Sequence, residues 1–141
     1  MPPVFPDSPT VIAATGAARA RTEGEAPGDV ETDFSVRLLR RFLTLCENPR
    51  TRSGMLRMVR ASVGSAGAGQ AFYRVLNRSV VNPVARATGM HASALRIELV
   101  CGQLVGLAMM RYVLQVEPVA STPAEEIVRQ FAPAIRATLR S

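Results

Sequence analysis

Residues 94–114 read ALRIELVCGQLVGLAMMRYVL, and this stretch decides the fold. Its centre, Leu99 to Met110, is hydrophobic all round a helix and is interrupted only by Gln103, which indicates a helix surrounded by protein. The predicted helix runs from His91 to about Val116, roughly 39 Å at a rise of ~1.5 Å per residue. The strongly apolar run is too short to span a membrane, because a bilayer requires ~20 apolar residues.

Helical periodicity continues on the N-terminal side of this segment. From Phe34 onward, apolar residues recur every three or four positions with polar residues between them. The pattern predicts one helix from Phe34 to Asn48, a second over residues 50–63 and a third that ends at Thr88. Pro83 lies inside the third helix and predicts a kink there, and Gly89 is a natural residue to follow its end.

A last helix is predicted after Thr122-Pro123. Thr122 as N-cap, Pro123 at the first helical position and Glu125 two residues later form a capping-box pattern. An apolar stripe then repeats every four residues: Ile127, Phe131, Ile135 and Leu139. No strand pattern of comparable strength occurs. The sequence therefore predicts an all-α helical bundle of about five main helices, with a weak short helix in front.

Residues 1–33 differ from the rest of the chain. Ser8-Pro9, followed by apolar residues, predicts a short helix that reaches to about Thr15. The tract from Ala17 to Asp33 is rich in Gly, Pro and Glu without a period, which predicts a flexible acidic connector. Residues 1–33 have a net charge of −4 and the other 108 residues one of +10. We therefore expect the functional domain to span residues 34–141.

Residue types typical of active sites and metal sites are scarce. His91 is the single histidine, and it is expected to be exposed at a helix start. Cys46 and Cys101 lie in apolar periodic stretches and no signal peptide is recognised, so we expect reduced core thiols in a cytoplasmic protein. The pattern predicts no enzyme, no metal and no cofactor. Arginines recur on the outer helix faces, which favours a solvated basic surface over a nucleic-acid site.

Two apolar features exceed what a plain bundle requires. Gly102 and Gly106 would let helix backbones approach closely, either within the fold or across a dimer, although glycine within a helix costs roughly 1 kcal/mol relative to alanine. The second feature is a set of adaptable side chains that suits a cavity for a promiscuous apolar ligand: Met55, Met58, Met109 and Met110, with Phe42 and Phe72. Ordinary core packing explains the same spacing.

Over roughly residues 34–141 the chain resembles the effector-binding half of the tetracycline-repressor (TetR/AcrR) family. The resemblance rests on an ordered set of stretches: VRLLRRFL at 36–43, NPRTR at 48–52, MLRMVRAS at 55–62, NPVAR at 82–86, residues 94–114, EPVA at 117–120 and FAPAI at 131–135. It implies an all-helical ligand-binding and dimerisation domain. Family members begin with a three-helix DNA-binding domain that has no counterpart in residues 1–33, so contact with DNA is expected only through a missing N-terminal domain.

The resemblance implies a transcriptional regulator, most simply a repressor, whose last two helices pair with those of a second subunit. The expected homodimer interface contains Gly102, Gln103, Gly106, Met110, Val128, Phe131, Ala132 and Ile135. It also supports an effector pocket for a small apolar molecule, with an expected lining of Phe42, Met55, Met58, Val59, Phe72, Leu76 and Met109. Arginine at Phe131 or Ile135 is then expected to break the dimer. The alternative is a helical interaction module that forms mixed dimers with a full-length regulator.

Overall fold

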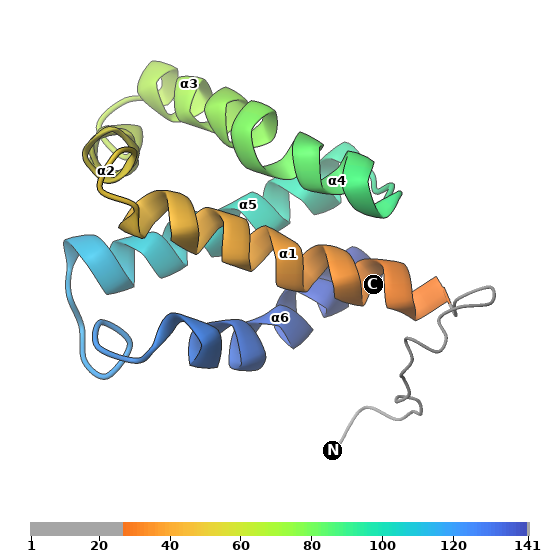
Figure 1. The fold of residues 1–141 in the computed structure, drawn as a ribbon. Coiled ribbons are helices and arrows are strands. Elements are labelled where there is room, and N and C mark those ends of the chain that lie inside the picture. Colours follow the sequence, from red (N-terminus) through yellow and green to blue (C-terminus); the bar gives the residue numbers. More distant parts are fainter. Residues whose placement is uncertain (1–26, 141) are drawn as a thin grey trace.

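The computed structural model describes residues 27–140, whose regular elements are all helical (Figure 1). The helices are α1 (Pro27–Glu47), α2 (Arg52–Ser62), α3 (Ala66–Leu76), α4 (Asn82–Thr88), α5 (Ala94–Ala108) and α6 (Ala124–Arg140). Two π-helical turns, η1 (Asn77–Val81) and η2 (Met109–Val113), continue α3 and α5. Because η1 joins α3 to α4 without a gap, the predicted all-α bundle of about five main helices is confirmed.

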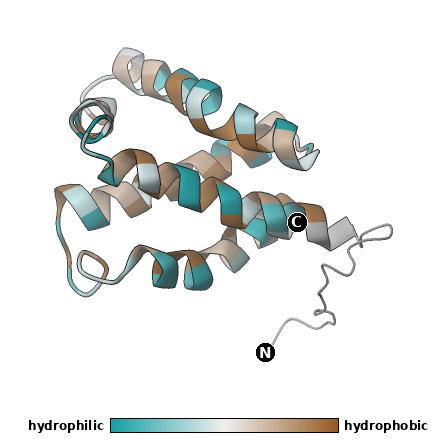
Figure 2. Ribbon diagram, viewed as in Figure 1, coloured by the Kyte–Doolittle hydropathy of each residue, from teal (hydrophilic) through white to brown (hydrophobic). Residues whose placement is uncertain are grey.

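The helices pack around α1, which lies in the middle of the bundle. Figure 1 shows α2, α3 and α4 on one side of α1 and α6 on the other, with α5 behind. Five apolar side chains of α1 are fully buried: Phe34, Leu38, Leu39, Phe42 and Cys46. Figure 2 shows hydrophilic and hydrophobic residues mixed along α1 and α6, as expected of helices with one face in a core.

α1 begins seven residues before the predicted start. The predicted connector is therefore wrong for residues 27–33, which are helical. Proline is favoured at the first position of a helix, and within α1 Asp33 pairs with Arg37 one turn later at 3.1 Å. Val30 packs against the core, and the buried Ser35 hydroxyl donates a 2.7 Å hydrogen bond to the Glu31 carbonyl. The short helix predicted near residues 8–15 lies outside the described residues.

The α-helical pattern is interrupted by a π turn just before Pro83, where a kink was predicted, and a carbonyl group there is satisfied from across the bundle. Proline has no N–H with which to bond the carbonyl of Ser79, four residues earlier. The chain forms the π turn η1 just before Pro83, and the Arg41 Nε of α1 donates a 2.9 Å hydrogen bond to the Ser79 carbonyl. Gly89 then ends α4 with φ 77°, as predicted, and its N–H bonds the Ala85 carbonyl.

α5 is shorter than predicted and is not surrounded by its own chain. It begins at Ala94, where the Ser93 hydroxyl caps it by accepting from the Arg96 N–H, and it gives way to η2 at Met109. One face is buried, through Val100, Cys101, Leu104 and Ala108. The other face exposes Leu95 and Leu99, so the interpretation of a fully enclosed helix is wrong within one subunit.

Candidate functional site

A groove of about 620 Å³ lies between α5, α6 and the segment that connects them. Its lining is mostly apolar: Gln103, Gly106, Leu107, Met110, Pro118, Val119, Thr122, Glu126, Ile127, Gln130 and Phe131. Gly106 of α5 and Met110 of η2 line one wall of the groove. The half-buried Ile127 and Phe131 come from the facing side of α6. The groove is therefore an apolar surface built by the last two helices.

The apolar surface continues along α5 beyond the groove. Leu95 is 63% exposed, Leu99 53% and Met110 42%. Gly102 and Gly106 lie between them, and a Cβ atom added to either would meet no heavy atom within 4 Å. Within residues 27–140, no neighbouring atom therefore excludes a side chain at these positions. We name this surface, made by the exposed faces of α5 and α6 and by the groove, the α5/α6 face.

The α5/α6 face contains five of the eight residues expected at a dimer interface. These are Gly102, Gln103, Gly106, Met110 and Phe131. The other three, Val128, Ala132 and Ile135, are 3%, 6% and 0% exposed and belong to the core that α6 shares with α1. Their side chains are thus covered within one subunit, and the expectation that they lie at a dimer interface stays a prediction.

The seven residues expected to line an effector pocket do come together. All belong to one hydrophobic cluster, to which α1, α2, α3 and η2 contribute. Phe42, Val59 and Leu76 are at most 1% exposed, and Met55 and Phe72 at most 5%. Met58 and Met109 are only partly buried and pack at the edge of the cluster. The predicted pocket residues thus form part of a packed core with two methionines at its margin.

A buried arginine that the sequence analysis did not single out ties the groove to the rest of the bundle. Arg111 in η2 is 8% exposed. Its Nε and Nη2 donate to Oε2 of Glu47 at the end of α1, at 3.2 and 3.0 Å. Its Nη1 donates to the carbonyls of Val119 and Thr122, at 2.8 and 2.6 Å. Since both carbonyls belong to residues that line the groove, Arg111 fixes one wall of the α5/α6 face.

Tyr112 completes this cluster. Its hydroxyl donates a 2.5 Å hydrogen bond to Glu47 Oε2 and accepts one from Arg111 Nε. Burial raises the pKa of Tyr112, and the hydrogen bond to Glu47 raises it further. Burial lowers the pKa of Arg111, but hydrogen bonds to Tyr112 and Glu47 outweigh that effect and raise it. Both groups therefore keep their protons, and the cluster is a structural ion pair, not a proton-transfer site. The only signal in the sequence was an arginine inside an apolar helix.

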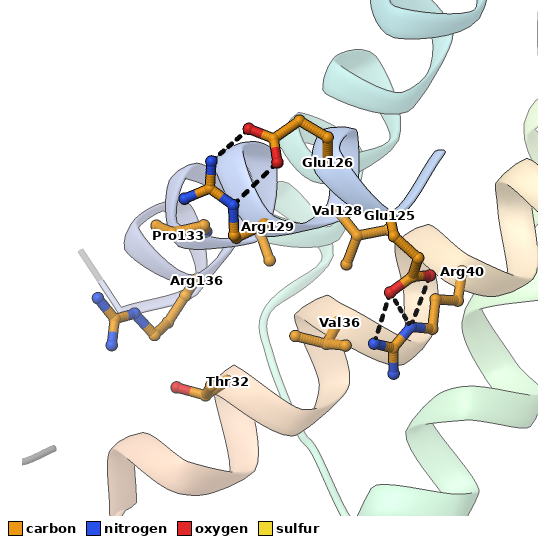
Figure 3. A pocket seen from close by; sticks show the side chains of 10 residues that line it. Thr32, Val36, Arg40, Glu125, Glu126, Val128, Arg129, Pro133 and Arg136 are labelled. Carbon is orange, nitrogen blue, oxygen red and sulfur yellow. Dashed lines mark hydrogen bonds and ion pairs between the residues drawn. The ribbon is translucent and has the colours of Figure 1, made fainter. Parts of the chain in front are cut away.

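A second hollow, of about 610 Å³, lies between α1 and the opposite side of α6 (Figure 3). Arg40 of α1 and Glu125 of α6 bridge it with an Nη2 to Oε1 distance of 2.8 Å, and Arg129 pairs with Glu126. The hydrogen bond to Arg40 lowers the pKa of Glu125.

The predicted capping box at the start of α6 is wrong. The Glu125 side chain binds Arg40, and the Thr122 hydroxyl donates to the Pro118 carbonyl.

The structure offers little for catalysis within residues 27–140. His91 is exposed, and no group of three or more His, Cys, Asp and Glu side chains there could hold a metal ion. Cys46 and Cys101 are buried and free. Burial raises the pKa of Cys46 to about 12 and that of Cys101 to about 11, so both thiols are protonated and unreactive at neutral pH.

A family model described as "Tetracyclin repressor-like, C-terminal domain" matches residues 33–139. The chain belongs to this family. The match covers the whole bundle from the second turn of α1 almost to the end of α6, and it identifies the fold as that of a TetR-like regulator domain. Searches of curated proteins and of solved structures found no match.

The family assignment agrees with the all-helical bundle that the structure shows for residues 27–140. From Pro27 to Arg140, none of the helices of this TetR-like domain is long and apolar enough to cross a membrane.

Proposed function

We propose that this TetR-like domain forms a homodimer through the α5/α6 face and binds a small apolar effector, as part of a cytoplasmic transcriptional repressor. The observation that carries the proposal is the exposed apolar strip of α5, in which Gly102 and Gly106 leave open space beside Leu99 and Met110. Exposed apolar side chains that are neighbours on one helix face are typical of protein interfaces.

A second copy of the chain is the occupant that this surface fits best. The family of this chain pairs its last two helices between subunits, and α5 and α6 are those two helices here. The two glycines would allow the α5 helices of both subunits to approach closely, and Phe131 and Met110 supply the aromatic and methionine side chains that interface centres favour. A two-fold axis would place the same face of each subunit against the other.

Replacement of Gly106 by leucine is expected to convert a dimer into a monomer without unfolding the domain. A Cβ atom added at Gly106 would meet no heavy atom within 4 Å, and leucine favours a helix by roughly 1 kcal/mol over glycine. In a dimer it would hold the two α5 helices apart. Analytical ultracentrifugation at micromolar concentration should give about twice the 15.2 kDa chain mass for the native protein and a single chain mass for Gly106→Leu.

The matched control is Gly67→Leu in α3. Gly67 is also an exposed helical glycine with no atom within 4 Å of an added Cβ, but it lies away from the α5/α6 face. This variant should remain dimeric. A native chain that sediments only as a monomer, or a Gly106→Leu variant that remains a dimer, would contradict the proposed interface.

The effector-binding part of the proposal rests on the methionine and phenylalanine cluster between α1, α2, α3 and η2. Methionine adapts its shape at low cost, so a core that contains Met55, Met58 and Met109 can rearrange around an apolar molecule. Met58 and Met109 lie at its margin, where a ligand would enter. In allosteric proteins, the free energy that couples the binding of one ligand to the affinity of a second site is typically about 1–3 kcal/mol.

We expect Met58→Gln to weaken binding of the neutral fluorophore N-phenyl-1-naphthylamine about tenfold, which corresponds to about 1.4 kcal/mol. The change puts an amide at the edge of the cluster, and the partial burial of Met58 lets the variant fold. Fluorescence titration measures the affinity. Met110→Gln on the α5/α6 face is the control and should bind the probe normally. The reverse pattern would place the probe in the groove and refute the pocket.

A further inference from the structure

The arginines that the structure describes fall into two groups, which differ in whether the guanidinium group has a hydrogen-bond or ion-pair partner. Between Glu47 and Glu98 the sequence has eight arginines and no aspartate or glutamate. Seven of them, all in or beside α2, α3, η1 and α4, are exposed: Arg50, Arg52, Arg57, Arg60, Arg74, Arg78 and Arg86. Within residues 27–140, the structure gives the side chains of these seven no hydrogen bond and no ion pair.

Most arginines in the other described helices are engaged; Arg140, at the end of α6, is exposed. Arg37 pairs with Asp33, Arg40 with Glu125, Arg111 with Glu47 and Arg129 with Glu126. Arg41 and Arg96 donate to the carbonyls of Ser79 and Leu139. Unsatisfied guanidinium groups therefore concentrate on the layer of α2, α3 and α4, which lies on the far side of α1 from α6 (Figure 1). We name this layer the arginine surface.

The densest part of the arginine surface is hollowed. A depression of about 450 Å³ on α2 is lined by Arg52, Ser53, Leu56, Arg57 and Arg60. Three guanidinium groups and one hydroxyl thus surround a single concavity, and no carboxylate lines it. Arginine presents a planar fork of donors that matches a phosphate group. A surface whose charges serve only solubility normally mixes acidic residues with its arginines. Residues 48–97 contain no acidic residue.

We propose that the arginine surface binds the phosphate backbone of duplex nucleic acid without reading its sequence. Arg52 and Arg60 are eight residues apart on α2, which is ~12 Å along a helix axis and close to the ~12 Å width of the major groove of DNA. Their side chains can therefore contact phosphates on the two sides of that groove. The arginines of α3 extend the positive surface along the duplex.

Features of the same surface disfavour other polyanions. The aromatic residues of α2 to α4 are Phe72, which is buried, and Tyr73, which is partly buried, so no exposed ring is available to stack on single-stranded bases. Val63 is the one large exposed apolar side chain in this layer, which is too little for insertion into a lipid membrane. None of the arginines lines the α5/α6 groove, so this binding is independent of dimerisation.

The test is fluorescence anisotropy of the full chain with a labelled 24-base-pair duplex of arbitrary sequence, at increasing salt. We expect binding at low salt that weakens linearly on a log–log plot, with a slope near −0.9 per phosphate contacted. The triple variant R52Q/R57Q/R60Q should bind at least tenfold more weakly and lower the magnitude of the slope by about 3. All three side chains are exposed, so circular dichroism should show an unchanged helical content.

The matched control is R37Q/R129Q/R140Q, which removes the same net charge from exposed arginines of α1 and α6. It should retain duplex affinity within about twofold. Equal losses in the two triple variants would show that only net charge matters and would overturn the proposal. Tighter binding to polyglutamate, to single-stranded DNA or to vesicles with 30% phosphatidylserine than to the duplex would assign the surface to a different partner and would overturn it as well.

Discussion

An Ile135→Arg variant is expected to lose its helical fold, whereas Phe131→Arg is expected to remain helical and to become monomeric. Ile135 is fully buried between α6 and α1, so arginine there would place an unpaired charge in the core. That costs several kcal/mol per ion, against a total stability of about 5–15 kcal/mol for a domain. Phe131 is half-buried on the α5/α6 groove, where arginine can reach water.

Far-UV circular dichroism during thermal unfolding, together with sedimentation, separates the two outcomes. Ile135→Val keeps the apolar contact and serves as the control for that position, with an expected loss of about 1 kcal/mol. A folded, monomeric Ile135→Arg protein would mean that α6 turns this side chain toward a partner and would refute the packing of α6 on α1. The two arginine variants, expected from the sequence to act alike, are thus expected to differ.

The geometry of a helix explains why the sequence could not separate them. Residues four apart are about 40° apart around the axis, because 3.6 residues complete one turn. The stripe of Ile127, Phe131, Ile135 and Leu139 therefore drifts by about 120° along α6. Its first two members line the groove with α5 and its last two are buried against α1. A single apolar stripe in the sequence belongs to two different surfaces in the structure.

Features that depend on neighbouring residues were predictable from the sequence. The apolar period predicted the main helices and the buried face of α1. Pro83 marked the region where the π turn η1 interrupts the α-helical pattern, and Gly89 predicted the end of α4. The start of α1 was missed because residues 27–33 lack an apolar period, although one side of that turn packs on the core through Val30. On α5, Gly102 and Gly106 have no close neighbour within the described residues, so the helix contact expected at them stays a prediction for a dimer.

Features that depend on distant residues were not predictable. Arg111 binds Glu47, which lies 64 positions earlier in the chain, and Arg40 binds Glu125, 85 positions away. No local pattern pairs these residues. The arginine surface likewise appears only when each guanidinium is compared with the carboxylates that surround it in space. The apolar residues of the candidate site were therefore predictable from the sequence, whereas its ion pairs and side-chain hydrogen bonds were visible only in the structure.

Arg111→Met is expected to destabilise the domain by about 3 kcal/mol, because it leaves Glu47 without its cation and two loop carbonyls without a donor. The Glu47 side chain is 38% exposed, so water relieves part of the loss and the effect stays below that of a fully buried pair. The carbonyls of Val119 and Thr122 lose their anchor, so the wall of the groove loosens. Urea unfolding at fixed protein concentration measures the change.

The double variant Arg111→Met/Glu47→Leu should recover part of this stability, because removal of both charges leaves no unpaired charge in the cluster, although the carbonyls of Val119 and Thr122 still lack their donor. Arg129→Met is the control: its ion pair with Glu126 is exposed, and its loss should change the free energy of unfolding by less than about 0.5 kcal/mol.

Dimer affinity should also fall in Arg111→Met, since Pro118, Val119 and Thr122 line the groove that Arg111 braces. A loss of less than about 1 kcal/mol would mean that the connecting segment holds its place without Arg111, and that the groove owes its shape to the apolar packing of α5 and α6 alone.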